Sequence, residues 1–183
     1  MLYKDKYRVE TARLQGWDYA TPGWYFVTIC TRDSACTLGQ VSAGKVALTP
    51  AGLIAQQCLY HICKITPHIQ LDALVVMPNH VHAIIVLEAQ ATAQTTAQPS
   101  RVADSTETRM ALISPRAGSL PAIIRSYKAA VSRRCANRGI AGLVWQERYY
   151  DHIIRNDGEL DRIRTYVANN PAQWEQDKLY APW

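Results

Sequence analysis

Hydrophobic residues along the chain fall into short segments with the lengths of strands. The segment 24–31 is rich in aromatic and β-branched residues, which predicts a central strand. Short alternating segments over 38–48 predict a hairpin. Two further runs, 69–77 and 81–87, are separated only by a Pro-Asn turn, so we expect them to pair as antiparallel neighbours.

Helix start and stop signals separate these strands. Thr49-Pro50 predicts a capped helix that runs to about residue 65, and a second helix is expected over about 119–136. Residues 145–154 are expected to be extended, and a last helix, capped by Asn156-Asp157, is expected over about 158–169. Pro171 should disfavour helical geometry at the residue before it.

Helices interspersed with antiparallel strands indicate an α+β fold, and a ferredoxin-like split βαβ core is the natural candidate. The length fits a single domain over residues 1–183. Residues of about 89–118 are dominated by Ala, Thr, Gln and Ser without a clear period, which predicts a mobile insertion.

Composition narrows the class of protein only moderately. Hydrophobic residues make up 48% of the chain, which argues against overall disorder, and the formal charge of +5 is compatible with a polyanionic partner. Five cysteines without a Cys-x-x-Cys pair argue against a disulfide framework or a cysteine zinc site. We find no signal peptide and no membrane segment, so we expect a cytoplasmic protein without a membrane partner.

His80 and His82 are the first candidates for chemistry. Side chains alternate across a strand, so both imidazoles should lie on one face, where they can bind one metal ion. They interrupt a segment that otherwise reads as buried, and burying imidazoles without partners is costly. The alternative is a pair of hydrogen-bonded histidines near a strand end, because His-x-His alone is weakly specific.

A second candidate lies on the last predicted helix. Tyr166 lies at the edge of the apolar stripe formed by Leu160, Ile163 and Val167, and Asn170 follows four residues later on nearly the same side. Tyrosine and amide could therefore both face the sheet that carries the histidines. Alternatively, Tyr166 is a tyrosine at the edge of the core beside a helix-terminal asparagine.

A third signal is the absence of acidic residues between Arg109 and Gln146. The helix predicted there carries Arg125, Lys128, Arg133 and Arg134. Such a basic surface suits phosphate contacts, although an ordinary solvated helix face has the same composition.

Together these segments resemble a known family. The run Met77-Pro-Asn-His-Val-His82 is similar to the motif of the single-tyrosine HUH transposases, and 144–155 with 164–171 resembles the second half of their pattern. The REP-associated tyrosine transposases are the most similar branch. The resemblance covers nearly the whole chain except about 90–109.

The resemblance implies a role for each matching residue. Tyr166 matches the nucleophile, His80 and His82 match the metal ligands, and Asn170 matches the amide that completes the metal site. The partner implied is single-stranded DNA with a hairpin, such as a REP-like palindrome, bound by a monomer or homodimer. Tyrosine attack would leave a covalent 5′-phosphotyrosine. The expected cofactor is a divalent metal, Mg²⁺ or Mn²⁺, although two imidazoles would also tolerate zinc.

Two other functions remain open at this level. In one, a metal-bound water attacks the phosphate and no covalent intermediate forms. In the other, the chain is a non-catalytic binder of structured DNA or RNA. The full set of motifs favours the tyrosine transposase over both.

Overall fold

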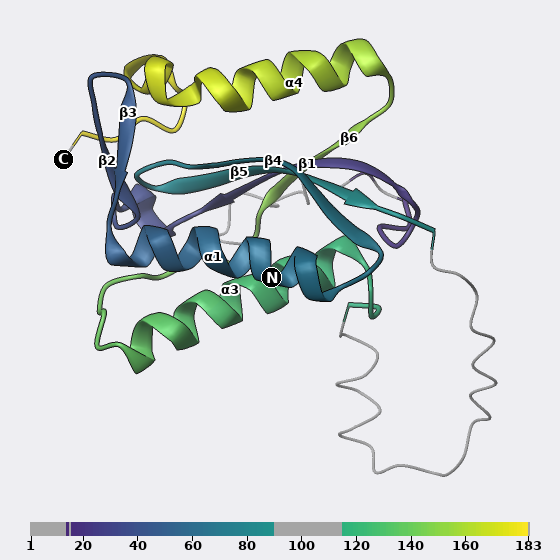
Figure 1. Ribbon diagram of the computed structural model, residues 1–183, viewed down its shortest axis with the longest axis horizontal. Coiled ribbons are helices and arrows are strands. Elements are labelled where there is room, and N and C mark those ends of the chain that lie inside the picture. Colours follow the sequence, from purple (N-terminus) through teal and green to yellow (C-terminus); the bar gives the residue numbers. More distant parts are fainter. Residues whose placement is uncertain (1–13, 15, 90–114, 183) are drawn as a thin grey trace, which may run out of the picture.

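The segments predicted from the hydrophobic pattern form a central sheet with helices on both faces in the computed structural model (Figure 1), which describes residues 14, 16–89 and 115–182. In chain order, the strands are β1 (Gly23–Cys30), β2 (Gly39–Ser42), β3 (Lys45–Leu48), β4 (Ile69–Val76), β5 (His80–Leu87) and β6 (Tyr150–Ile154). The α-helices are α1 (Pro50–Ile65), α3 (Leu120–Asn137) and α4 (Asp157–Asn169), and the short 3₁₀ helices are η1 (Arg32–Ser34) and η2 (Asn170–Gln176). None of the described helices combines the length and apolar character that crossing a membrane requires.

The main sheet has the strand order β4-β5-β1-β6, and every neighbouring pair is antiparallel. The chain order of its elements is β1, α1, β4, β5, α3, β6, which is the βαββαβ order of a ferredoxin-like fold. The predicted α+β class, the ferredoxin-like core and the pairing of β4 with β5 are therefore confirmed. The predicted hairpin is also present, as the separate two-stranded sheet of β2 and β3.

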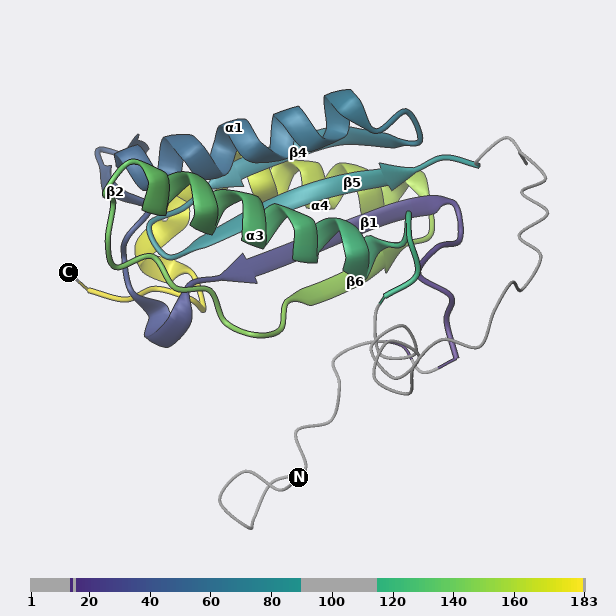
Figure 2. The same ribbon diagram turned by 90° about the horizontal axis from the view of Figure 1, so that it is seen from below.

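The helices divide unequally between the two faces of the sheet. α1 and α3 pack side by side on one face, whereas α4 lies alone across the other face (Figures 1 and 2). Alternate residues of β5 therefore face different layers. Val81, Ala83 and Ile85 point into the core under α1 and α3, whereas Ile84 packs in a separate cluster with Leu160 of α4.

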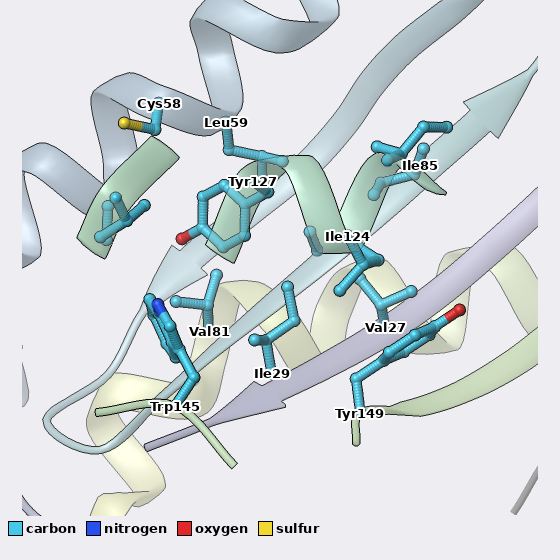
Figure 3. Close-up of a cluster of buried hydrophobic side chains, with 14 of the residues drawn as sticks. Val27, Ile29, Cys58, Leu59, Val81, Ile85, Ile124, Tyr127, Trp145 and Tyr149 are labelled. Carbon is cyan, nitrogen blue, oxygen red and sulfur yellow. The ribbon is translucent and has the colours of Figure 1, made fainter. Parts of the chain in front are cut away.

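The larger core lies between the sheet and the helix pair α1 and α3. Figure 3 shows Tyr127 of α3 against Trp145, with ring centroids 5.9 Å apart, and Tyr149 beside Val27 of β1. All three aromatic rings are buried. These three rings therefore pack in the core, whereas the neighbouring Tyr150 is exposed.

Both predicted helix caps are present. The Thr49 side chain accepts a hydrogen bond from the Gly52 amide at the start of α1, with Pro50 in the first turn. The Asn156 side chain accepts from the Glu159 amide at the start of α4. These local bonds satisfy amides that have no partner within a helix, and they fix where each helix begins.

Two sequence expectations are corrected by the structure. Asn170 is helical, with φ −55° and ψ −41°, despite Pro171, because the chain continues from α4 into η2 and the proline occupies the first turn of η2. The extended segment expected over 145–154 is a strand only at Tyr150–Ile154, and Trp145 makes a single isolated bridge to Thr31. The insertion predicted at about 89–118 lies almost entirely outside the described residues.

Candidate active site

His80 and His82 begin the central strand β5 and point toward α4. Their ring centroids are 4.4 Å apart, and the two residues are only 0% and 2% exposed. The register of the sheet places Thr28 of β1 directly opposite His82. The expectation that both histidines share one face is therefore met. That face of the sheet is the one that α4 covers.

Neighbouring side chains hold one nitrogen of each imidazole. Asn79 Oδ1 lies 2.8 Å from His80 Nδ1, and Thr28 Oγ1 lies 2.9 Å from His82 Nδ1. The Asn79 amide is itself oriented, because its Nδ2 donates to the backbone oxygens of Ser34 and Leu179. These contacts leave Nε2 of both rings directed to the space below α4, which is the arrangement that second-shell partners give to metal-binding histidines.

Tyr166 enters the same space from α4. Its hydroxyl lies 3.2 Å from His82 Nε2 and donates to Asp177 Oδ2 at 3.1 Å. The residue is 40% exposed, and its ring meets the edge of the Phe26 ring. The phenol thus lies between the buried imidazoles and solvent, where a substrate phosphate could reach it.

Asn170 and Asp177 complete the group. Asn170 Nδ2 donates to Asp177 Oδ2 at 2.6 Å, and the Leu179 amide donates to Asp177 Oδ1 at 2.7 Å. One nitrogen from each of His80 and His82 and a carboxylate oxygen of Asp177 lie within 4.8 Å of one another, so these three residues could hold a metal ion.

Two buried atoms in this group lack a hydrogen-bond partner, His80 Nε2 and Asn170 Oδ1. An unpartnered buried polar atom is costly, and a metal ion would satisfy both lone pairs. Imidazole nitrogen, amide oxygen and carboxylate oxygen are also all ordinary ligands of divalent metals. The donor set therefore fits a divalent metal.

The protonation of these groups follows from their burial. Burial lowers the pKa of His80 to about 4, and burial together with the His80 ring lowers the pKa of His82 to about 3. Burial and the Asp177 carboxylate raise the pKa of Tyr166 to about 12. At neutral pH both imidazoles are therefore neutral and available as ligands, and the phenol is protonated.

The lowered histidine pKa values predict acid sensitivity when a chelator is present. Below the ordinary pKa of 6.5, the unfolded chain binds protons that the folded state does not. The free energy of unfolding should therefore fall between about pH 6.5 and 4, by up to about 1.4 kcal/mol per pH unit for each histidine. Urea denaturation over this range measures the slope. His82→Asn should reduce this pH slope of the unfolding free energy by about half. An unchanged slope in the variant would contradict the lowered pKa of His82.

An ion pair ties α4 to the edge of the sheet. β4 has a bulge at Asp72, where the register against β5 shifts between Leu71 and Ala73. Arg164 of α4 donates to both carboxylate oxygens of Asp72, from Nε at 2.9 Å and from Nη2 at 2.6 Å. The same guanidinium lies over the Trp24 ring, 5.5 Å from its centroid. Because Arg164 is two residues before Tyr166, this paired contact positions the helix that carries Tyr166.

We expect Asp72→Ala to loosen α4 selectively. The backbone amides of α4 should exchange hydrogen several-fold faster in this variant than in the unmodified protein, whereas the amides of α1 should keep their rates. Exchanging the two charges, in the double variant Asp72→Arg with Arg164→Asp, should restore part of the protection. Arg162→Ala is the matched control, since among the described residues Arg162 pairs with Glu159 of its own helix, at 3.7 Å. Equally fast amide exchange of α4 in Arg162→Ala would count against the Asp72–Arg164 ion pair as the contact that holds α4.

The basic residues predicted to bind DNA lie on α3, on the face of the sheet opposite to α4 (Figure 2). Arg125 and Arg133 are exposed, and Arg134 is partly buried. The Lys128 ammonium donates to the backbone oxygens of Gln146 and Arg148 at 2.6 and 2.9 Å. Lys128 is thus engaged within the chain, where it holds the segment before β6.

Of the aromatic residues near the start, Tyr19 is buried, and Trp17 is 37% exposed with its indole nitrogen donating to Tyr25. Of the other tyrosines, Tyr127 and Tyr149 are buried on the α3 side of the sheet, and Tyr150 lies opposite Thr28 in the register of β6 and β1. Tyr127 and Tyr149 do not share a layer with the histidines, and among the described contacts it is the Tyr166 hydroxyl that lies within hydrogen-bond distance of a histidine.

Asp177 is the site residue that sequence reasoning missed. It lies eleven residues after Tyr166, beyond η2, where no strand or helix period predicts its direction. The one available signal was its place between two aromatic residues that anchor the segment, Trp174 and Tyr180, whose rings pack 5.3 Å apart. Tertiary packing, rather than local spacing, brings this carboxylate to the histidines.

Comparisons with known proteins give one curated relative and nine structural matches, two of which are described below. No protein-family model matches the chain. An uncharacterized protein of Haemophilus influenzae is 34% identical over 168 residues, which cover 92% of this chain and 91% of the relative. The structure of a REP-associated tyrosine transposase bound to a REP hairpin matches with a TM-score of 0.54 and 19% identity, over 88% of this chain and 73% of that chain. A candidate transposase from Deinococcus radiodurans matches at a TM-score of 0.44 and 17% identity, over 86% of this chain and 95% of that chain, which is too distant to add to the comparison.

Proposed function

Because the chain belongs to one family with the Haemophilus influenzae protein and has the fold of a REP-associated tyrosine transposase, we propose that it cuts and rejoins single-stranded DNA. The substrate is a strand that folds into a hairpin, and the intermediate is a covalent 5′-phosphotyrosine. The hairpin is taken from the structural relative, which is bound to a REP hairpin. The whole chain acts as one such domain, as a monomer or homodimer.

One observation carries this proposal. The Tyr166 hydroxyl lies within hydrogen-bond distance of His82 Nε2, in the same group of side chains that could hold a metal ion. A phosphate bound there would meet the phenol and the ligands together. A tyrosine that served only in packing would not need its hydroxyl beside two neutral, buried imidazoles.

The residues then have separate roles. His80 and His82, completed by Asn170 or Asp177, would hold a divalent ion, Mg²⁺ or Mn²⁺, which when bound would polarise the scissile phosphate. Asp177 orients the Tyr166 phenol by accepting a hydrogen bond from its hydroxyl at 3.1 Å. Tyr166 Oη forms the new bond to phosphorus and gives its proton to the Asp177 carboxylate, the bond from phosphorus to the 3′ oxygen breaks, and that oxygen takes up a proton and leaves as a hydroxyl. Attack by a 3′-hydroxyl on the phosphotyrosine reverses these changes and joins two strands.

The test is incubation of the protein with end-labelled hairpin DNA and either Mg²⁺ or Mn²⁺, followed by a denaturing gel. The expected result is labelled DNA that migrates with the protein and is released by protease. Cleavage without such an adduct would identify a nuclease that uses metal-bound water. Binding without cleavage in both metals would identify a non-catalytic binder. An unstructured strand of equal length should form less adduct than the hairpin.

We further propose that the exposed arginines of α3 contact the DNA backbone. Arg125→Ala and Arg133→Ala should each weaken hairpin binding with little dependence on sequence, and should lower the slope of log affinity against log salt by about one unit. Arg134→Ala is expected to behave similarly but with a smaller effect, since Arg134 is partly buried. Lys128→Ala should act instead through the carbonyl groups it holds, and therefore through stability. Hairpin affinity measured at several salt concentrations tests this proposal. Unchanged salt slopes in the arginine variants would show that α3 does not contact the DNA backbone.

A further inference from the structure

A cavity of about 350 Å³ opens beside Tyr166 where α4 passes into η2. Its lining comprises Tyr166, Asn170, Gln173, Gln176, Asp177 and Lys178. Cavities of about 300–1,000 Å³ are the usual size for small-molecule sites, so this one can hold a single nucleotide unit. None of the roles assigned above uses Gln173, Gln176 or Lys178.

Three carboxamides line this cavity at a regular spacing. Asn170, Gln173 and Gln176 lie three residues apart along η2, which is kinked at Gln173 (φ −108°, ψ 17°), and all three side chains line the cavity. Asn170 is buried and bonded to Asp177, whereas Gln173 and Gln176 are exposed. The nucleophile therefore lies beside a short row of amides that ends in solvent.

The chemistry of this row favours a nucleobase over a phosphate. A carboxamide carries a donor and an acceptor side by side, which is the pattern that pairs with the edge of a base, whereas phosphate binding relies on cationic and N–H donors. The cavity lining contains one cation, Lys178, and one carboxylate, Asp177. A base against the two glutamines with its phosphate toward Lys178 would satisfy this lining.

We propose that this cavity is a subsite for the nucleobase next to the scissile phosphate, recognised by Gln173 and Gln176. The inference rests on the proposed function, because it is the phosphodiester bound at Tyr166 that would bring a neighbouring base to this cavity. The subsite adds to the proposed function that residues of η2 select the base beside the cut.

The experiment measures the rate of adduct formation on hairpin substrates that carry each of the four bases at the two positions on either side of the cut. The unmodified protein should prefer one base at one flanking position by about 5- to 100-fold. Gln173→Ala or Gln176→Ala should reduce that preference several-fold. Gln176→Glu, which replaces the amide donor by a second acceptor, should shift the preference toward cytosine, whose amino group donates. Gln57→Ala, an exposed glutamine on α1 across the sheet, should leave the preference unchanged.

Binding of the same substrates to Tyr166→Phe, with and without Gln173→Ala, is measured in parallel. A base preference in binding that depends on Gln173, with no adduct from the unmodified protein, would contradict the proposed chemistry and support the subsite. Adduct formation with a preference that no glutamine variant changes would overturn the subsite and leave the chemistry intact. Equal rates for all four bases at every flanking position would likewise overturn it.

Discussion

Tyr166→Phe should form no covalent adduct with DNA while it still folds and binds the hairpin. The change removes only the hydroxyl, so the edge contact between this ring and Phe26 is kept. Loss of a nucleophile typically lowers the rate by about ten-thousandfold or more, which puts adduct formation below detection on a gel. Peptide mapping of the adduct from the unmodified protein locates the linkage directly.

Tyr150→Phe is the matched control for that result. Tyr150 is 55% exposed and lies opposite Thr28 of β1 in the register of β6, so the same change removes an exposed hydroxyl from a tyrosine near the histidines and is sterically harmless there. It should form adduct at the normal rate. DNA attached to any tyrosine other than Tyr166, or an adduct still formed by Tyr166→Phe, would show that the nucleophile is wrongly assigned.

The second large effect is expected from the histidines. His80→Ala and His82→Ala should each reduce cleavage by at least about a thousandfold, because the phosphate loses the ion that polarises it, whereas hairpin affinity should change only a few-fold. Chelation of the metal should reproduce the loss in the unmodified protein, and added Mn²⁺ should reverse it. Calorimetric titration with Mn²⁺ alone measures the site without any DNA and should show weak or no binding to either variant.

Both histidines are buried, so truncating them also leaves a cavity, and a control for packing is needed. Cys30→Ala supplies it, since Cys30 is directly opposite His80 in the register of β1 and β5 and is 4% exposed. It should keep most of the cleavage activity and its affinity for Mn²⁺. A histidine variant that cleaves at the normal rate in metal would remove the metal site from the mechanism.

Local patterns in the sequence were sufficient to predict most of the secondary structure. The Thr49 and Asn156 caps set the starts of α1 and α4, and the alternation around His80 and His82 placed both on one face. The strand and helix order was enough to indicate the ferredoxin-like arrangement. These features depend on residues near one another in the chain, which is where periodicity and capping rules hold.

The features that the sequence did not predict depend on contacts between distant segments. The Asp72 bulge is visible only in the register of β4 against β5, and its partner Arg164 is 92 residues away. Asp177 reaches the histidines only because η2 folds back beneath α4, and that path requires Asn170 to remain helical before Pro171. At Asn170, tertiary packing overrides the preference that Pro171 imposes against helical geometry. Tertiary packing likewise directs the Lys128 ammonium to backbone oxygens.

The unequal layering of the sheet has an evolutionary consequence. Most buried hydrophobic residues lie between the sheet and the helix pair α1 and α3, whereas only a small cluster around Ile84, Ile154 and Leu160 lies under α4. Folding therefore depends mainly on one face, and the residues proposed for catalysis occupy the other. Mutations at exposed residues of that face, such as Tyr166, can accumulate without unfolding the chain. A lineage can accordingly lose the residues proposed for catalysis, keep a stable protein with its α3 surface intact, and reuse that protein under new selection.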